Sequence, residues 1–160
     1  MARAFGIVTS SGTHIKVEGM QDYRPIGAFS FLGRYRAIDF PISNMSNSGI
    51  DRIQVYVRRK PRSLAEHLGT GRHYNINSKR GKLQLLFSEN NAENNIYNTD
   101  IAAFSENLEF IERMREPYVI IAPSYMYMQQ IMLLFWMRTL NPEQTSHFFT
   151  IQSITQEKRS

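Results

Sequence analysis

Short apolar runs alternate along this chain with segments whose apolar residues recur every three or four positions. The runs at 4–8, 52–57 and 118–122 are typical of β-strands. The last of them is continuously apolar, as are strands buried inside parallel sheets. This alternation of strand and helix signals predicts a layered α/β domain with a mostly parallel sheet.

The segment 37–50 predicts a helix between the first two strands. Ile38, Ile42 and Met45 fall at helical spacing, and Gly49 is placed to cap the carboxyl end. A strand on each side of one helix makes a βαβ unit, which normally joins parallel strands.

Two later segments also predict helices. Ser63 and Glu66 form a Ser-x-x-Glu capping box, which indicates a helix over 63–68. The clearest helical pattern spans 99–115, where either Thr99 or Asp100 supplies the amino-terminal cap. Its predicted buried stripe consists of four apolar residues, Ile101, Phe104, Leu108 and Ile111.

A polar, asparagine-rich stretch separates these two helices. We interpret residues 72–98 as a long excursion around one short strand at 83–87. Residues 128–140 have a helical pattern, and we find no internal repeat or linker. The whole chain is therefore expected to form part of one domain.

Composition narrows the class of protein. The chain has 160 residues, 42% apolar and 21% charged, which is ordinary for a soluble domain. It has no cysteine, which excludes disulfides and thiolate metal sites. Its most apolar run, 131–137, is too short to span a bilayer, so we expect a soluble protein with no membrane partner. The absence of cysteine suits a reducing cytosol, so we expect a cytoplasmic location.

Basic residues give the chain a formal charge of +5 and gather at 58–62 and 79–82. Such clusters suit a solvated loop face, small anionic ligands or nucleic acid. No recognised nucleic-acid motif accompanies them, which disfavours the last alternative.

The histidines lack metal-binding spacing, and we interpret His67 as an ordinary helix residue. No Gly-x-Ser-x-Gly elbow, Walker loop or Gly-x-Gly-x-x-Gly is present. The remaining candidate is the turn after the first strand, which contains Gly12 and resembles the start of a phosphate-binding loop. In open α/β sheets ligands bind beyond the carboxyl ends of strands, where Arg24 would add positive charge.

Three longer motifs resemble one family of sugar-1-phosphate nucleotidyltransferases, the glucose-1-phosphate adenylyltransferases (ADP-glucose pyrophosphorylases). They are RPIGAFSFLGRYRAIDFPISNMSNSGIDRIQVY (24–56), RSLAEHLGTG (62–71) and NNIYNTDIAAFSENLEFIER (94–113), within a resemblance covering about 5–127. The resemblance implies a Rossmann-like nucleotide-binding domain. The family joins ATP and glucose 1-phosphate into ADP-glucose and pyrophosphate, with Mg²⁺, in glycogen biosynthesis.

The match weakens at the family's active site. The family loop Gly-Gly-x-Gly-Thr-Arg-Leu keeps only Gly12 and Thr13 here, and His14 replaces its arginine. Arg24 replaces the family's lysine, and Ser124 stands where the family carries the metal-binding aspartate. The resemblance thus implies residual nucleotide or phosphate contacts at Gly12, Thr13, His14 and Arg24. It also implies no confident catalytic residue and impaired Mg²⁺ binding.

This pattern resembles the regulatory-type, GlgD-like subunits of the family. It implies a non-catalytic chain that assembles with a catalytic subunit and has ATP, ADP-glucose or glucose 1-phosphate as possible ligands. Residues 1–160 would form the amino-terminal part of a nucleotidyltransferase-like domain, incomplete, atypical over 128–160 and without the family's β-helix domain.

Two alternatives remain open. One is a weakly active nucleotidyltransferase, in which Arg24 and carboxylates such as Asp39 and Asp100 suffice for catalysis. The other is a phosphate- or nucleic-acid-binding α/β module that uses the two basic clusters.

Overall fold

A computed structural model describes the chain over residues 4–10, 17–19, 23–57, 60–69, 71–76, 81–87 and 99–127. Three candidate phosphate-binding residues, Gly12, Thr13 and His14, lie outside these residues, as does the helix expected at 128–140. Among the described residues, no helix has the length and apolar character needed to cross a membrane.

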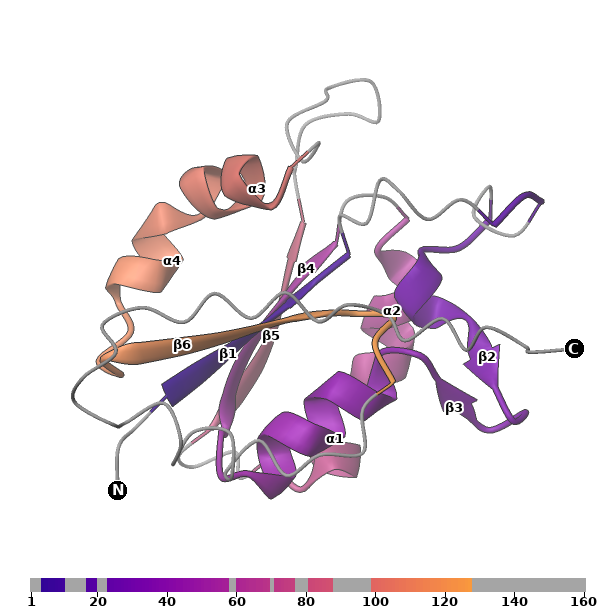
Figure 1. Ribbon diagram of the computed structural model, residues 1–160, viewed down its shortest axis with the longest axis horizontal. Coiled ribbons are helices and arrows are strands. Elements are labelled where there is room, and N and C mark those ends of the chain that lie inside the picture. The colour runs from indigo at the N-terminus through magenta and orange to yellow at the C-terminus, as the bar shows by residue number, and fades with distance from the viewer. Residues whose placement is uncertain are drawn as a thin grey trace, which may run out of the picture.

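The described chain forms the predicted α/β domain around a four-stranded parallel sheet (Figure 1). The strand order is β5-β4-β1-β6. The strands are β1 (Ala4–Thr9), β4 (Arg52–Val57), β5 (Lys82–Phe87) and β6 (Tyr118–Pro123). Because all neighbouring pairs are parallel, all four carboxyl ends meet at one edge of the sheet.

Helices cover both faces of this sheet (Figure 1). Helices α1 (Asp39–Asn47) and α2 (Arg62–Leu68) pack on one face, and α3 (Asp100–Glu106) and α4 (Leu108–Glu112) cover the other. The two central strands are therefore buried on both sides. In β4, Ile53, Val55 and Val57 contribute to one core, and Tyr56 contributes to the other.

Helix α1 ends as its sequence predicts. Gly49 has a φ of +78°, and its N–H donates to the Ser46 carbonyl at 2.9 Å. The Ile50 N–H donates to the Met45 carbonyl at 3.0 Å. This pair of bonds is a Schellman cap, in which the left-handed position favours glycine.

The capping box predicted for α2 is wrong. Pro61 already has helical dihedral angles, and its carbonyl accepts from Leu64 and Ala65. Ser63 therefore lies inside the helix, where its buried hydroxyl has no hydrogen-bond partner among the described residues. Glu66 instead pairs with an arginine one turn earlier.

The helix predicted over 99–115 is two helices. Thr99 caps the first, accepting from the Ala102 N–H at 3.2 Å, as expected. Asn107 then leaves helical geometry, and its side chain donates to the Ala103 carbonyl at 3.0 Å.

Half of the predicted apolar stripe is wrong. Ile101, in the first turn of α3, is 76% exposed, and Leu108, directly after the break, is 50% exposed. Ala103 and Asn107 are buried instead, with Phe104 and Ile111 partly buried beside them.

Strand β6 is exposed, contrary to the expectation of a buried strand. It pairs with β1 along one side only among the described residues, and Val119 and Ile121 are 44% and 51% exposed. An edge position explains this exposure, because no described strand or helix covers the outer part of β6.

A small hairpin stands beside the main sheet. Its strands are β2 (Ser30–Phe31) and β3 (Tyr35–Arg36), and two 3₁₀ turns, η1 (Ile26–Ala28) and η2 (Arg72–Tyr74), complete the described elements. The rings of Phe31, Phe40 and Tyr127 pack together at the hairpin, one pair stacked and two edge-to-face, with centroid separations between 4.7 and 5.9 Å.

Candidate functional site

Two serines meet at the carboxyl edge of the sheet. Ser10 follows β1 and Ser124 follows β6, and the Ser10 hydroxyl donates to the Ser124 Oγ at 3.1 Å. The backbone holds them there, because the Ser124 N–H donates to the Thr9 carbonyl at 2.7 Å. The Ser10 N–H donates to the Tyr56 carbonyl at the end of β4, so three strands position the pair.

Ser124 is fully buried. Its exposed fraction is 0%, and η1 packs directly against it. A Cβ added to Gly27 would stand 2.9 Å from the Ser124 Cβ and 3.0 Å from its Oγ. Glycine is therefore required at position 27 for η1 to approach the end of β6 this closely.

These residues do not fit a Mg²⁺ site. Mg²⁺ prefers carboxylate oxygens and bound water, whereas Ser124 offers one neutral hydroxyl that already accepts from Ser10. Within the described ranges, no three His, Cys, Asp or Glu side chains gather in a metal-binding group.

Arg24 lies just before η1 and is exposed. Its side chain has no ion-pair or hydrogen-bond partner in the part of the chain that the structure describes. Only two residues separate it from Gly27, which contacts Ser124, so its positive charge lies on the segment that packs against the serine pair. The structure does not position Gly12, Thr13 or His14 relative to it.

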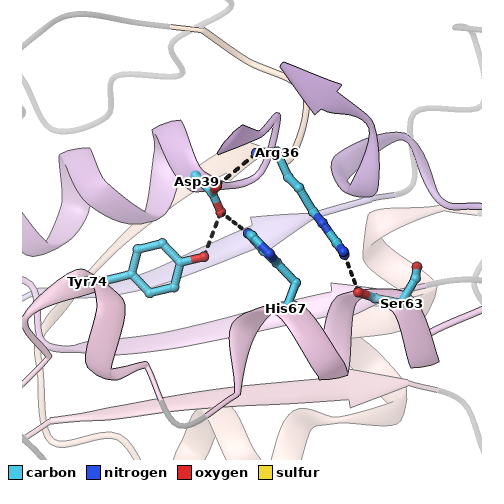
Figure 2. A network of polar contacts seen from close by, with 5 residues as sticks. All are labelled: Arg36, Asp39, Ser63, His67 and Tyr74. Carbon is cyan, nitrogen blue, oxygen red and sulfur yellow. Dashed lines mark hydrogen bonds and ion pairs between the residues drawn. The ribbon is translucent and has the colours of Figure 1, made fainter. Parts of the chain in front are cut away.

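A second polar cluster centres on Asp39, in the first turn of α1 (Figure 2). The Tyr74 hydroxyl donates to Asp39 Oδ1 at 2.6 Å, and His67 Nε2 lies 2.6 Å from the same oxygen. The Arg36 N–H donates to Asp39 Oδ2 at 2.8 Å. The carboxylate thus joins α1, α2, η2 and the end of the hairpin.

The electrostatics of this cluster favour a neutral tyrosine. Burial, the hydrogen bond to Asp39 and the negative charge of that carboxylate raise the pKa of Tyr74 well above its usual value. The Arg36 guanidinium opposes this shift, and it also donates to the Ser63 carbonyl in α2 (Figure 2).

Sequence reasoning missed this cluster. It treated His67 as an ordinary helix residue and Asp39 as a carboxylate that a weakly active nucleotidyltransferase could use. The partners stand 28 and 35 positions from Asp39, so no local spacing could reveal them. Asp39 is committed to these contacts, and Asp100 is the first residue of α3.

Comparison with known proteins identifies relatives over most of the chain. Residues 6–155 match the model of a family described as nucleotidyl transferase. The chain is 33% identical over 129 residues to the glycogen biosynthesis protein GlgD of Geobacillus stearothermophilus, covering 77% of this chain and 36% of that protein. GlgD of Bacillus subtilis strain 168 is 28% identical over 120 residues, covering 75% and 35%.

Glucose-1-phosphate adenylyltransferases are similar at a comparable level. The enzyme of Clostridioides difficile strain 630 is 39% identical over 95 residues, which covers 59% of this chain and 25% of that protein. The chain therefore spans between a quarter and about a third of the length of these curated relatives.

Proposed function

Because this chain belongs to the nucleotidyl transferase family, we propose that it acts as a GlgD-like, non-catalytic subunit of a glucose-1-phosphate adenylyltransferase in glycogen biosynthesis. The observation that carries the proposal is the serine pair. Ser124 occupies the position at which the resemblance expects a metal-binding aspartate, and it is buried and hydrogen-bonded to Ser10.

The chemistry of the family explains why this position matters. A phosphate oxygen of glucose 1-phosphate would attack the α-phosphorus of ATP, and the bond to pyrophosphate would break. Both reactants are anions, so charge must be neutralised as the new bond forms. Mg²⁺ supplies that neutralisation when bound, and the closed serine pair offers it no carboxylate.

Residual nucleotide binding is the second part of the proposal. Arg24 is exposed and unpaired among the described residues, and it precedes the turn that contacts Ser124. We assign it a phosphate contact, with Gly12, Thr13 and His14 completing the loop. Binding without turnover would let the chain influence a catalytic partner through their interface, provided that the partner has two states with unequal affinity for it.

The test is pyrophosphate release from ATP, glucose 1-phosphate and Mg²⁺, after a melting curve has established that the chain is folded. We expect no turnover by the chain alone and a higher rate or affinity of a catalytic subunit when the two are mixed. Turnover by the chain alone would overturn the proposal in favour of a weakly active nucleotidyltransferase.

Nucleotide binding is tested separately with matched arginine variants. We expect Arg24→Gln to weaken ATP binding by about ten-fold, because a charge-assisted hydrogen bond to phosphate is lost. Arg34→Gln removes an equally exposed charge from the hairpin turn and should leave ATP affinity unchanged. Equal effects of the two variants, or no ATP binding at all, would contradict the assignment of Arg24.

A further inference from the structure

A small cavity with both polar and apolar lining lies at the amino ends of β4 and β5, at the edge of the sheet opposite the serine pair. Its volume is about 310 Å³, and side chains of Arg52, Gln54, Lys82, Gln84 and Met114 line it. This volume is at the lower limit of small-molecule sites and too small for a macromolecular segment of any length.

The strand register gathers these polar residues. Arg52 pairs with Lys82, and Gln54 pairs with Gln84. Alternate residues of a strand share a face, and neighbouring strands lie about 4.8 Å apart. The four side chains therefore form two adjacent cross-strand pairs on the face covered by α4. We call Arg52 with Lys82 the first rung and Gln54 with Gln84 the second rung. The Gln54 Nε2 donates to the Phe110 carbonyl in α4 at 3.2 Å.

The first rung carries an excess of positive charge. Like charges on adjacent strands repel each other and need compensation. Arg52 has a loose ion pair, with its Nε 3.4 Å from Glu116 Oε1, and its side chain remains 41% exposed. Lys82 has no carboxylate partner in the described ranges. The nearby Asp51, whose carbonyl accepts from the Lys82 N–H, makes no ion pair within those ranges either.

The second rung supplies a fixed amide and a free one. Gln54 is 1% exposed, and its Oε1 accepts from the Tyr56 hydroxyl at 2.9 Å, so its orientation is set. Gln84 is half-buried, and its side-chain amide has no hydrogen-bond partner within the described part of the chain. Its NH₂ group is thus available to donate to an oxyanion, while Met114 provides an apolar wall.

We propose that this cavity binds a small phosphate monoester. The phosphate group lies between Arg52 and Lys82 and neutralises the repulsion between them, and the Gln84 amide donates to one of its oxygens. A dianion with several acceptor oxygens matches two cations and an amide donor. The site is separate from the proposed nucleotide site, so the inference does not depend on the function proposed above.

Calorimetric titration of the full chain with inorganic phosphate and with glycerol 3-phosphate tests the proposal. We expect saturable binding of both, tighter for the organic ester because its carbon skeleton can contact Met114. Lys82→Gln should weaken binding by about ten-fold. Gln84→Glu should abolish it, because the new carboxylate repels the phosphate.

Two control variants separate this cavity from other cationic surfaces. Lys60→Gln, which alters the basic cluster at 58–62, and Arg34→Gln, in the hairpin turn, should each retain the wild-type affinity for glycerol 3-phosphate. Binding that is insensitive to Lys82→Gln, binding lost in either control, or no saturable binding by folded protein would overturn the proposal. Tighter binding of inorganic phosphate than of the ester would assign the cavity to the free ion instead.

Discussion

Asp39 accepts hydrogen bonds from three separate parts of the chain. The contribution of each bond to the free energy of unfolding can be measured with single substitutions. One oxygen is shared by Tyr74 and His67, and the other accepts from the backbone of Arg36. A buried carboxylate is tolerated only when it is paired or hydrogen-bonded. We therefore regard the cluster as a structural junction, distinct from the site at the serine pair.

Tyr74→Phe tests the energy of the hydrogen bond between Tyr74 and Asp39. Loss of a hydrogen bond to a charged acceptor should lower the free energy of unfolding at neutral pH by about 1.5 to 3 kcal/mol. Chemical denaturation, followed by circular dichroism, would measure this. Tyr23→Phe is the matched control, because Tyr23 is 77% exposed and should change stability little.

The stability difference between wild type and Tyr74→Phe should also depend on pH. The pKa of Tyr74 is raised in the fold above its unfolded value of about 10, so the folded chain keeps a proton that the unfolded chain releases. The stabilisation is complete below pH 10 and is lost as pH rises above it. The stability gap between wild type and Tyr74→Phe should therefore narrow above pH 10. A gap that stays constant or widens there would show that the phenol does not keep its proton.

The left-handed conformation at the carboxyl end of α1 can be tested with variants of Gly49. Gly49→Ala should cost about 1 to 2 kcal/mol, because a side chain disfavours the left-handed conformation. No heavy atom lies within 4 Å of the added Cβ, so steric overlap contributes nothing. Gly49→Asn should cost less, since asparagine tolerates this conformation. Equal losses in the two variants, measured by thermal unfolding, would contradict the backbone explanation.

Elements specified by local chemistry could be predicted from the sequence. The helical spacing of Ile38, Ile42 and Met45 and the cap at Gly49 depend on residues a few positions apart, and both are observed. The α2 start was misjudged because Pro61 begins the helix earlier than the capping box suggests.

Features set by long-range packing could not be predicted. Asn107 breaks a continuous helical pattern through hydrogen bonds that no apolar periodicity records, so Leu108 was wrongly assigned to the core. The apolar composition of β6 indicates burial, but exposure depends on its place at the edge of the described sheet. For the candidate site, the sequence identified Ser124 as the altered position, and only the structure revealed its bond to Ser10.

No strand of the described sheet pairs with the outer side of β6, so we expect this edge to affect association between chains. Exposed apolar edge strands promote pairing between chains, and a lysine on such a strand opposes it. Ile121→Lys should reduce concentration-dependent association in sedimentation velocity, while its exposure limits the change in stability to about 0.5 kcal/mol. Leu32→Lys adds the same charge at an 83% exposed residue away from β6 and should have less effect. Identical behaviour of both variants would mean that net charge, and not the strand edge, governs association.

The position of β1 between β4 and β6 also has a consequence for the chain as it is synthesised. β1 is the first strand of the sheet to leave the ribosome, and β4 supplies one of its neighbours soon afterwards. Its other neighbour comes much later, because Ser124 follows Ser10 by 114 residues. At about 5–20 residues per second, translation leaves that side of β1 unpaired for roughly 6 to 23 seconds. During this interval the nascent chain presents an apolar strand to which chaperones can bind.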